Sequence, residues 1–461
     1  MLFAFQVSVA QNSYIINRLP TNSRMYDDFA PVVFNDGLLF CSDRKTNVFV
    51  DYKALDNSRP LNFYFAIKKD SLKWSTPRLF SKELKTVFNE GPASFNESTH
   101  TLFFTRDISI DKKNKMTPNN SGIFYVVQNG NAWGAIQAFP YNDPAFKTGH
   151  PSATLDGETL YFASDRPGGN GKSDIYVSHL VNGQWSEPEN LGENVNSPNS
   201  EIYPFILSGE RLYFSSDGPG SLGGLDLYYS RNMGGEWMPP IHLNTPFNST
   251  ADDYAFTSDP SLSSGYFSSN RERSDNIYSF SSQIPSMVGC SEQVENNYCY
   301  LFFEKGEMNL DTLPYIYEWN LGDSTYLRGL KVQHCFEKPG KYLIALNVLD
   351  TLVGAVMKNV ATYQVAIEPE VQVYISSQDT VYSGESVRFN ASDSYLPGTQ
   401  ILDYFWNFDD GNISKTANPE NIFQSPGIYH VHLLVKSTPN TLGTQQDFCS
   451  YKNIVVINRL P

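Results

Sequence analysis

The sequence has few positive charges and no long apolar run. Of its 461 residues, 34 are Lys or Arg and 49 are Asp or Glu, which gives a formal net charge of −15. Nucleic acids and anionic lipid headgroups bind basic surfaces, so neither is an expected partner. No stretch approaches the roughly 18 apolar residues that a membrane-spanning helix needs, and we expect no direct membrane span.

Cysteine is also scarce, with five in the whole chain. Cys41 lies in a Leu-Phe-Cys-Ser-Asp segment and is predicted to be a buried free thiol. The other four, Cys290, Cys299, Cys335 and Cys449, lie in the last third of the chain. An exported protein pairs four cysteines in one of three ways, and the sequence does not choose between them. No cysteine spacing fits a zinc site.

Catalytic signatures are missing as well. The chain contains neither a Gly-x-Ser-x-Gly elbow nor a His-Glu-x-x-His motif, and its seven histidines are scattered. Asp323, Asp409 and Asp410 have the chemistry to hold calcium but are predicted to cap turns. A carboxylate pair for glycoside hydrolysis needs only spatial proximity, so the sequence does not exclude one. We expect no catalytic residue, no cofactor and no metal, and a protein that is not an enzyme.

The chain begins with MLFAFQVSVA, a short apolar run. Residues 1–10 are predicted to be the remainder of a secretory signal with cleavage near Ala10, and a buried first strand is the alternative. The expected location is therefore outside the cytoplasm: the periplasm, the outer membrane or the cell surface.

A repeat dominates what the sequence does contain. Its best copies, His150–Gly192 and Tyr203–Asn244, share a turn, an aromatic strand, Ser-Asp, a Gly-rich loop, a second strand and a Trp. Five copies of the aromatic strand recur at spacings of 64, 58, 52 and 53 residues, centred on Phe40, Phe104, Phe162, Phe214 and Phe267. Short strands at a regular period predict the blades of a β-propeller. Five blades are expected, or six if a further copy hides in the long second unit.

The ends of these repeat units predict how the propeller closes. Four units carry an outer-strand Trp, and the fifth stops at Phe280 without one. Ser13–Asn22 resembles the outer-strand tails Pro188–Val195 and Ile241–Phe247. We expect this N-terminal strand to complete the last blade of a propeller spanning residues 11–282, which removes two free edges. Prolines at the entry of four units predict strand starts there: Pro31, Pro92, Pro151 and Pro204.

Asp and Arg recur where the aromatic strand turns into a loop. Most are predicted to satisfy loop amides and neighbouring blades, because half-buried charges need partners. The alternative is a partner-binding loop face. Its candidate residues are Arg44, Arg106, Asp165, Arg166, Asp217 and Arg271. The Gly-rich loops Pro167–Gly171 and Gly218–Gly224 lack the context of a phosphate-binding loop and are predicted to be turns.

The pattern changes from Cys290 onward. Trp319-Asn320-Leu321-Gly322-Asp323 precedes a Pro-Gly turn and an alternating strand, and Trp406-Asn407-Phe408-Asp409-Asp410-Gly411 precedes another. A strand with a core Trp, a turn and a second alternating strand are typical of a small antiparallel sandwich. Two such domains are predicted, over residues 288–367 and 369–459.

Both parts of the chain resemble known families. The LYFxSDR…DIY…G-x-W repeat resembles the TolB-type, WD40-like (PD40) repeat of bacterial envelope proteins, and the two later segments resemble the PKD domain. The second has Asp409 where that family more often has Gly, and the first has Ser324 in place of the last Gly. The resemblance implies an all-β protein: a five-bladed β-propeller followed by two Ig-like PKD β-sandwiches.

Propeller-plus-PKD chains are similar to Bacteroidota envelope proteins associated with type IX secretion and gliding. The similarity implies a non-catalytic scaffold that docks envelope proteins of an outer-membrane complex through its propeller, with the PKD domains as spacers. The alternative is a secreted carbohydrate-binding or polysaccharide-degrading protein with a propeller head, in contact with glycan or peptidoglycan. Titratable residues that converge in the central funnel would favour this alternative.

Overall fold

The structure is a computed structural model that describes residues 14–45, 59–70, 73–86, 89–108, 120–130, 132–303, 315–439 and 446–458. The expected signal remainder, residues 1–10, lies outside these ranges. All regular elements in the described ranges are β-strands. Accordingly, none of these ranges contains a helix long and apolar enough to cross a membrane.

Five antiparallel sheets follow one another in the described part of residues 14–282, and we call this part the ring. The first sheet contains β2 (Asp28–Phe34), β3 (Gly37–Ser42), β4 (Asn62–Ile67) and β5 (Arg78–Leu79). The second contains β6 (Glu90–Asn96), β7 (Thr101–Ile108), β8 (Asn120–Asn129), β9 (Ala132–Trp133) and β10 (Gln137–Ala138). The third contains β11 (Thr148–Ala153), β12 (Thr159–Ser164), β13 (Asp174–Val181), β14 (Gln184–Trp185) and β15 (Glu189–Asn190). The fourth contains β16 (Glu201–Leu207), β17 (Arg211–Ser216), β18 (Asp226–Met233), β19 (Glu236–Trp237) and β20 (Ile241–His242). The fifth contains β21 (Asp253–Ser258), β22 (Ser264–Ser269), β23 (Asn276–Ser282) and β1 (Tyr14–Arg18).

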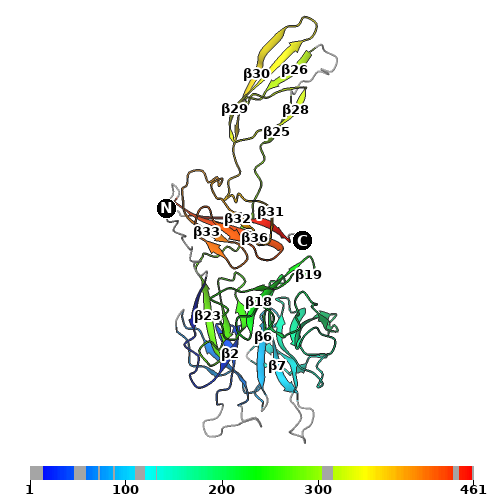
Figure 1. Ribbon diagram of the computed structural model, residues 1–461, viewed down its shortest axis with the longest axis vertical. Helices are drawn as coiled ribbons and strands as arrows, with labels where there is room; N and C mark the ends of the chain where they lie inside the picture. The colour runs from blue at the N-terminus through cyan, green and yellow to red at the C-terminus, as the bar shows by residue number, and fades with distance from the viewer. Residues whose placement is uncertain are drawn as a thin grey trace, which may run out of the picture.

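The sheets are arranged like the blades of a β-propeller (Figure 1). The first strand of each sheet, which we call its inner strand, packs against the inner strands of the sheets before and after it, and β21 packs back against β2. The chain closes the ring through β1, which pairs antiparallel with β23 from Tyr14 opposite Ser282 to Arg18 opposite Tyr278. This pairing covers an edge that would otherwise expose unpaired backbone groups.

Buried phenylalanines hold each sheet in place. The five phenylalanines of the repeat are each at most 1% exposed, and each lies in the second strand of its sheet: Phe40, Phe104, Phe162, Phe214 and Phe267. Fully burying such a side chain contributes roughly 1.5–3 kcal/mol. The repeat spacing in the sequence is therefore the spacing of the ring's core residues.

Each inner strand contains a bulge at the same position. The ladder register shifts there, and one residue per strand has a positive φ: Ala30 (50°), Gly91 (101°), His150 (53°), Tyr203 (53°) and Ala255 (52°). The entry prolines follow the first four of these residues directly. They therefore lie within strands, and the prediction from the sequence that they mark strand starts is wrong. A bulge interrupts the ladder, so a residue without an N–H is tolerated there.

Two smaller units follow the ring (Figure 1). The distal unit, farther from the ring, contains β25 (Cys299–Phe303), β26 (Tyr315–Asn320), β27 (Tyr326–Arg328), β28 (Lys331–Cys335), β29 (Gly340–Asp350) and β30 (Val356–Ile367). The proximal unit, next to the ring, contains β31 (Thr380–Tyr382), β32 (Ser386–Arg388), β33 (Ile401–Asn407), β34 (Ile413–Ser414), β35 (Glu420–Ile422), β36 (Gly427–Ser437) and β37 (Asp447–Ile457). The short strand β24 (Ser291–Glu292) also belongs to the proximal unit, because it pairs parallel with β37.

The two units share their core design. Trp319 is 2% exposed and Trp406 is fully buried, and each indole Nε1 donates to a backbone carbonyl, of Gly329 (2.9 Å) and Thr416 (2.8 Å) respectively. A buried indole needs such an acceptor. The predicted core position of both tryptophans is confirmed.

The structure selects one cysteine pairing. Cys290 is bonded to Cys449, and Cys299 to Cys335, while Cys41 is free and buried. The first disulfide joins the segment after the ring to β37, and the second joins β25 to β28 within the distal unit. Disulfides of this kind are typical of exported proteins.

Candidate functional site

A channel of about 1060 Å³ opens at one end of the ring. All five inner strands line it, from their bulges to the turns that follow them, and we call the end with these turns the mouth. The volume is at the upper end of the range for ligand-binding pockets, and the position on the axis of a propeller-like fold is a common one for ligand sites. We therefore take the channel as the candidate functional site.

Apolar and aromatic side chains form much of the channel wall. Phe95 and Phe205 contribute from two inner strands, and Leu155, which is 78% exposed, lies at the mouth. Trp74 meets Tyr266 edge-on with ring centroids 6.1 Å apart, and the Lys68 ammonium lies 5.9 Å from the Trp74 ring. These aromatic rings are half-buried, and together with Leu155 they provide apolar contact area beside the Lys68 ammonium.

A stack of rings lies at the level of the bulges. His150 stacks on Tyr203 with centroids 4.0 Å apart and planes within 12°, and Tyr203 in turn contacts Tyr254 at 5.1 Å. Burial lowers the pKa of His150 to about 4 and raises the pKa of Tyr203. Both rings are therefore uncharged at neutral pH, which suits their packing in the centre of the ring.

Hydroxyl groups join neighbouring sheets at three of the five bulges. A Ser or Thr in the second strand of one sheet accepts a hydrogen bond from the bulge amide of the following sheet. These bonds run from Ala30 N to Ser268 Oγ (2.9 Å), from His150 N to Thr105 Oγ1 (2.8 Å) and from Ala255 N to Ser215 Oγ (3.3 Å). Because the bulge amides leave the ladder, they need acceptors of this kind.

His150 replaces the missing hydroxyl in the third sheet. The equivalent residue there is Ala163, and Nδ1 of His150 accepts the hydrogen bond from the Tyr203 amide instead, at 3.3 Å. In the first sheet the position is Cys41, and its sulfur packs against Gly91, where any Cβ would collide with it. The buried thiol predicted at Cys41 is confirmed.

The turns at the mouth are acidic. Asp36, Glu97, Asp156 and Asp259 line it, against the single cation Lys68 among the described lining residues. Hydrogen bonds from Thr154 and from the Glu158 amide lower the pKa of Asp156. Burial would raise the pKa of Asp259, but hydrogen bonds from Ser261 and Ser264 outweigh it and lower that pKa. No three His, Cys, Asp or Glu side chains within the described ranges form a group suited to a metal ion.

The predicted partner-binding residues lie at the opposite end of the ring, which we call the loop face. Three of the arginines each pair with a buried carboxylate that begins the inner strand of the same sheet. These pairs are Arg44–Asp28 (2.6 Å), Arg106–Glu90 (2.8 Å) and Arg271–Asp253 (2.5 Å). Each guanidinium also donates to a loop carbonyl, of Thr21, Leu84 and Phe247 in the same order.

The other three predicted residues are also held within the loop face. Asp165 and Asp217 accept hydrogen bonds from the backbone amides of Lys147 (2.5 Å) and Ser200 (2.7 Å). Arg166 differs from the other arginines, because Thr148 replaces the inner-strand carboxylate in its sheet. Its guanidinium packs over three aromatic rings, and its buried Nη2 has no hydrogen-bond partner among the described residues. Docking of a partner on this face stays a prediction.

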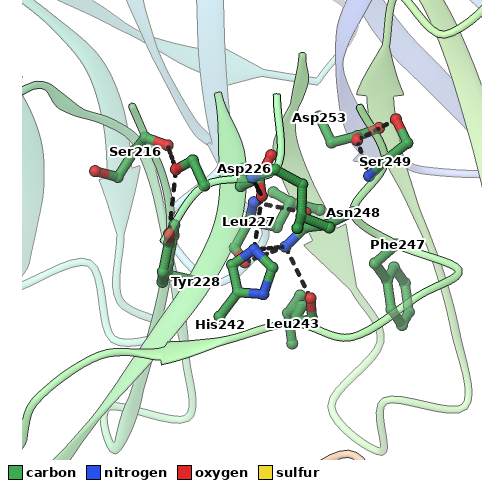
Figure 2. Close-up of polar contacts among 12 residues, drawn as sticks. Ser216, Asp226, Leu227, Tyr228, His242, Leu243, Phe247, Asn248, Ser249 and Asp253 are labelled. Atoms are coloured by element: carbon green, nitrogen blue, oxygen red, sulfur yellow. Dashed lines mark hydrogen bonds and ion pairs between the residues drawn. The ribbon is translucent and has the colours of Figure 1, made fainter. Parts of the chain in front are cut away.

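An asparagine that recurs in the repeat holds the backbone at the loop face, and the sequence analysis did not identify it. Figure 2 shows the fourth sheet, where Asn248 accepts from the Leu227 amide (2.8 Å) and donates to the Leu227 carbonyl (2.9 Å). The same picture shows Asp226, whose Oδ2 lies 2.6 Å from His242 Nε2. Equivalent two-point contacts join Asn22 to Ile277, Asn142 to Ile123 and Asn196 to Ile175. The signal available in the sequence is an Asn near the end of four of the five outer-strand tails: Asn22, Asn142, Asn196 and Asn248.

The proximal unit is anchored to the ring beside the mouth. The carboxylate of Asp409, 5% exposed, pairs with Arg211 and with Arg231, whose Nη1 lies 3.0 Å from Oδ2. Arg231 also donates to the Ile428 carbonyl at 2.6 Å, and the Tyr229 hydroxyl donates to the Asp409 carbonyl at 3.1 Å. Burial would raise the pKa of Asp409, but the two arginines outweigh it and lower that pKa. We call this group of residues the clasp.

The three aspartates with calcium-type chemistry all have protein partners. Asp409 belongs to the clasp, and Asp410 accepts from the Asn421 amide group (2.7 Å) and from the Asn412 backbone amide (2.9 Å). Asp323 accepts from the backbone amide of Thr325 (3.0 Å), and its Oδ2 lies 2.6 Å from His334 Nε2. Asp323 and Asp410 therefore cap turns, as the sequence predicts.

The C-terminal part of the chain matches a known family. Residues 288–366 and 368–449 both match the model of the PKD domain, so the presence of two PKD domains is confirmed. A segment of 82 residues is 32% identical to collagenase ColA of Bacillus cereus. The match takes in 17% of this chain and 8% of the collagenase.

Several solved structures are similar to part of this chain. The endo-arabinase from Bacteroides thetaiotaomicron is 13% identical, with a TM-score of 0.38 over 58% of this chain and 98% of that one. A thermostable family-43 glycoside hydrolase is 11% identical, with a TM-score of 0.37 over 59% and 97%. A puromycin-hydrolyzing peptidase from Mycobacterium tuberculosis is 11% identical, with a TM-score of 0.32 over 80% and 60%. These neighbours are enzymes, which corrects the sequence prediction that the chain is not one.

Proposed function

We propose that the protein is an exported carbohydrate-active protein whose central channel binds a segment of polysaccharide. The observation that carries this proposal is the channel of about 1060 Å³, whose wall combines aromatic side chains such as Trp74, Phe95 and Phe205 with polar groups. A sugar ring has apolar C–H faces and hydroxyl edges, and a wall that combines aromatic faces with a few placed polar groups complements both.

Serine hydroxyls supply part of this polar lining. Ser94 Oγ accepts the Ala153 amide at 3.3 Å, and Ser152 Oγ accepts the Ile206 amide at 3.0 Å. Both serines line the channel. A hydroxyl that accepts one bond from the backbone still has its own proton to donate, so these two groups are oriented donors for a ligand oxygen.

Features typical of exported proteins support a substrate outside the cytoplasm. Two disulfides and two PKD domains are features of exported proteins, and polysaccharide is available to such a protein in the envelope or outside the cell. The periplasm and the outer membrane are the compartments that we propose.

The test is a binding screen against soluble polysaccharides by titration calorimetry, with the full chain. We expect one class of glycan to bind. Trp74→Ala and Leu155→Ala should weaken binding about tenfold each, which corresponds to about 1.4 kcal/mol. The matched control is Leu222→Ala, because Leu222 is also an exposed leucine of the ring, at 55%, but does not line the channel. Absence of binding to every glycan, or equal losses in the control, would overturn the proposal.

The same incubations should be assayed for new reducing ends. Glycoside hydrolysis uses two carboxyl groups beside the scissile bond. Asp36 and Glu97 are exposed carboxylates that line the mouth. Cleavage that is lost in Asp36→Asn or Glu97→Gln, with binding retained, would assign the reaction to the mouth.

A further inference from the structure

A groove of about 330 Å³ lies between the ring and the proximal unit. On the ring side it includes Leu207, Ser208 and Pro260, and these three residues also line the channel. On the other side it is lined by Asn407, Asp409 and His432. The groove is therefore continuous with the mouth of the channel, and its far wall belongs to a PKD domain.

Two connections hold this far wall in position. The clasp joins the proximal unit to the fourth sheet through Asp409, Arg211 and Arg231. The Cys290–Cys449 disulfide ties the segment that leaves the ring to β37 of the proximal unit. The groove is accordingly bounded by two bodies with fixed contacts, and the segment Ile284–Cys290 that joins them also lines it.

The groove presents hydrogen-bonding groups with free capacity. His432 Nδ1 lies 2.8 Å from the His430 carbonyl, so it carries the proton and leaves Nε2 as an acceptor in the neutral ring. Asn407 Oδ1 accepts from the Asp409 amide at 2.9 Å, which leaves its amide nitrogen as a donor. Glu210 adds an exposed carboxylate from the ring side. Donors and acceptors of this kind match sugar hydroxyls.

The mouth that separates channel and groove restricts the charge of a ligand. Four carboxylates and one ammonium group line the channel at this end. An opening lined mainly by carboxylates has a negative potential, so it would repel a polymer of uronic acids.

We propose that the groove is an extension of the glycan site and that the proximal PKD domain binds ligand directly, beyond the spacer role that the sequence predicts. The ligand is a linear, uncharged polysaccharide long enough to leave the channel through the mouth and run along the groove. This inference rests on the proposed function of the channel.

The experiment measures affinity against chain length. Oligosaccharides of increasing length, prepared from the neutral polysaccharide that binds, are titrated into the full chain by calorimetry. Affinity should rise again once the oligosaccharide is longer than the channel accommodates. His432→Ala should remove this second rise, with a loss of about fivefold for long oligosaccharides and no change for short ones. His432→Gln, which retains an acceptor, should recover part of it.

Matched controls come from the same strand and from an equivalent turn. His430 lies two residues from His432 but does not line the groove, so His430→Ala should leave every affinity unchanged. From the ring side, Glu210→Ala should weaken only long oligosaccharides, and Glu158→Ala, at the same turn position of the third sheet, should not. If a substitution at His432 disturbs the fold of the proximal unit, the comparison of Glu210→Ala with Glu158→Ala still tests the proposal.

The outcomes separate the two proposals. If short oligosaccharides bind and length has no further effect, the groove proposal is overturned while the channel proposal stands. If oligosaccharides of every length fail to bind, the channel proposal fails first. Tighter binding of a uronic acid polymer than of its neutral counterpart would also overturn the proposed ligand class.

Discussion

At the scale of single residues, His150 shows how one side chain compensates for another. It supplies the acceptor that Ala163 lacks, and it stacks on the residue whose amide it accepts. The sequence identifies His150 only as the start of a repeat unit. Its role depends on Tyr203 and Ala163, which belong to different sheets, so no local pattern predicts it.

The lowered pKa of His150 predicts a stability loss in acid. The folded pKa is about 4 and the ordinary value is 6.5. Between these values the unfolded chain binds a proton that the folded chain does not, so stability is complete above about pH 6.5 and falls toward pH 4. The loss at pH 4 should reach about 3 kcal/mol, and urea unfolding of the full chain at several pH values measures it.

A double variant serves as the control for this pH dependence. His150→Phe keeps the ring stack but leaves the Tyr203 amide without an acceptor, at a cost of about 1–3 kcal/mol. Adding Ala163→Ser should supply the hydroxyl that three other sheets have at this position and recover that stability. Because it has no imidazole at position 150, the double variant should also lose less stability than the wild type between pH 6.5 and pH 4. An unchanged pH profile would show that another group is responsible.

At the scale of elements, most strands of the ring can be predicted from the sequence. The phenylalanines of the repeat are core residues because their period is the period of the sheets. The segment resembling an outer-strand tail, Ser13–Asn22, contains β1, which pairs with β23. The bulges and β24 could not be predicted from the sequence. A bulge shifts the register of a strand by one residue and β24 has only two residues, so neither produces a periodic pattern of apolar residues. β24 pairs with β37, about 160 residues away in the chain.

Removal of β1 should destabilise the ring selectively. Deletion of residues 14–22 uncovers the edge of β23. It also removes the buried Leu19 and the two hydrogen bonds between Asn22 and Ile277. In calorimetry, the ring transition should fall by at least about 5 °C while the transition of the C-terminal units stays in place. Ile16→Asp should act in the same direction, and Ile15→Ala should not, because Ile15 is 49% exposed. Two unmoved transitions would contradict a closing role for β1.

At the scale of the whole molecule, the clasp explains a departure from a family pattern. The PKD hallmark more often has Gly where this chain has Asp409, and the residue has a positive φ of 64° that suits Gly. The Asp409 carboxylate neutralises two arginines of the ring, a contact that Gly would not make. Those arginines lie 198 and 178 residues earlier in the chain, so the sequence shows the departure but not its reason. The channel likewise forms only when distant residues such as Trp74 and Tyr266 meet.

Asp409→Gly should release the proximal unit from the ring. The backbone would accept the change, but two largely buried guanidinium groups would lose their counter-charge, a loss that costs about 3–5 kcal/mol for a buried pair. Small-angle scattering should then show a broader distribution of particle lengths. Asp323→Asn, in the distal unit, is the control and should leave the scattering unchanged. A particle as rigid as the wild type would show that the remaining contacts suffice.

The Cys290–Cys449 bond has a mechanical consequence. It precedes β24 and ends in β37, so the whole distal unit lies inside the loop that it closes. Tension applied between the ring and the last described residues passes through this covalent link and bypasses the distal unit. The distal unit therefore carries none of this tension, and a cut within it would leave the ring covalently joined to β37 through the disulfide.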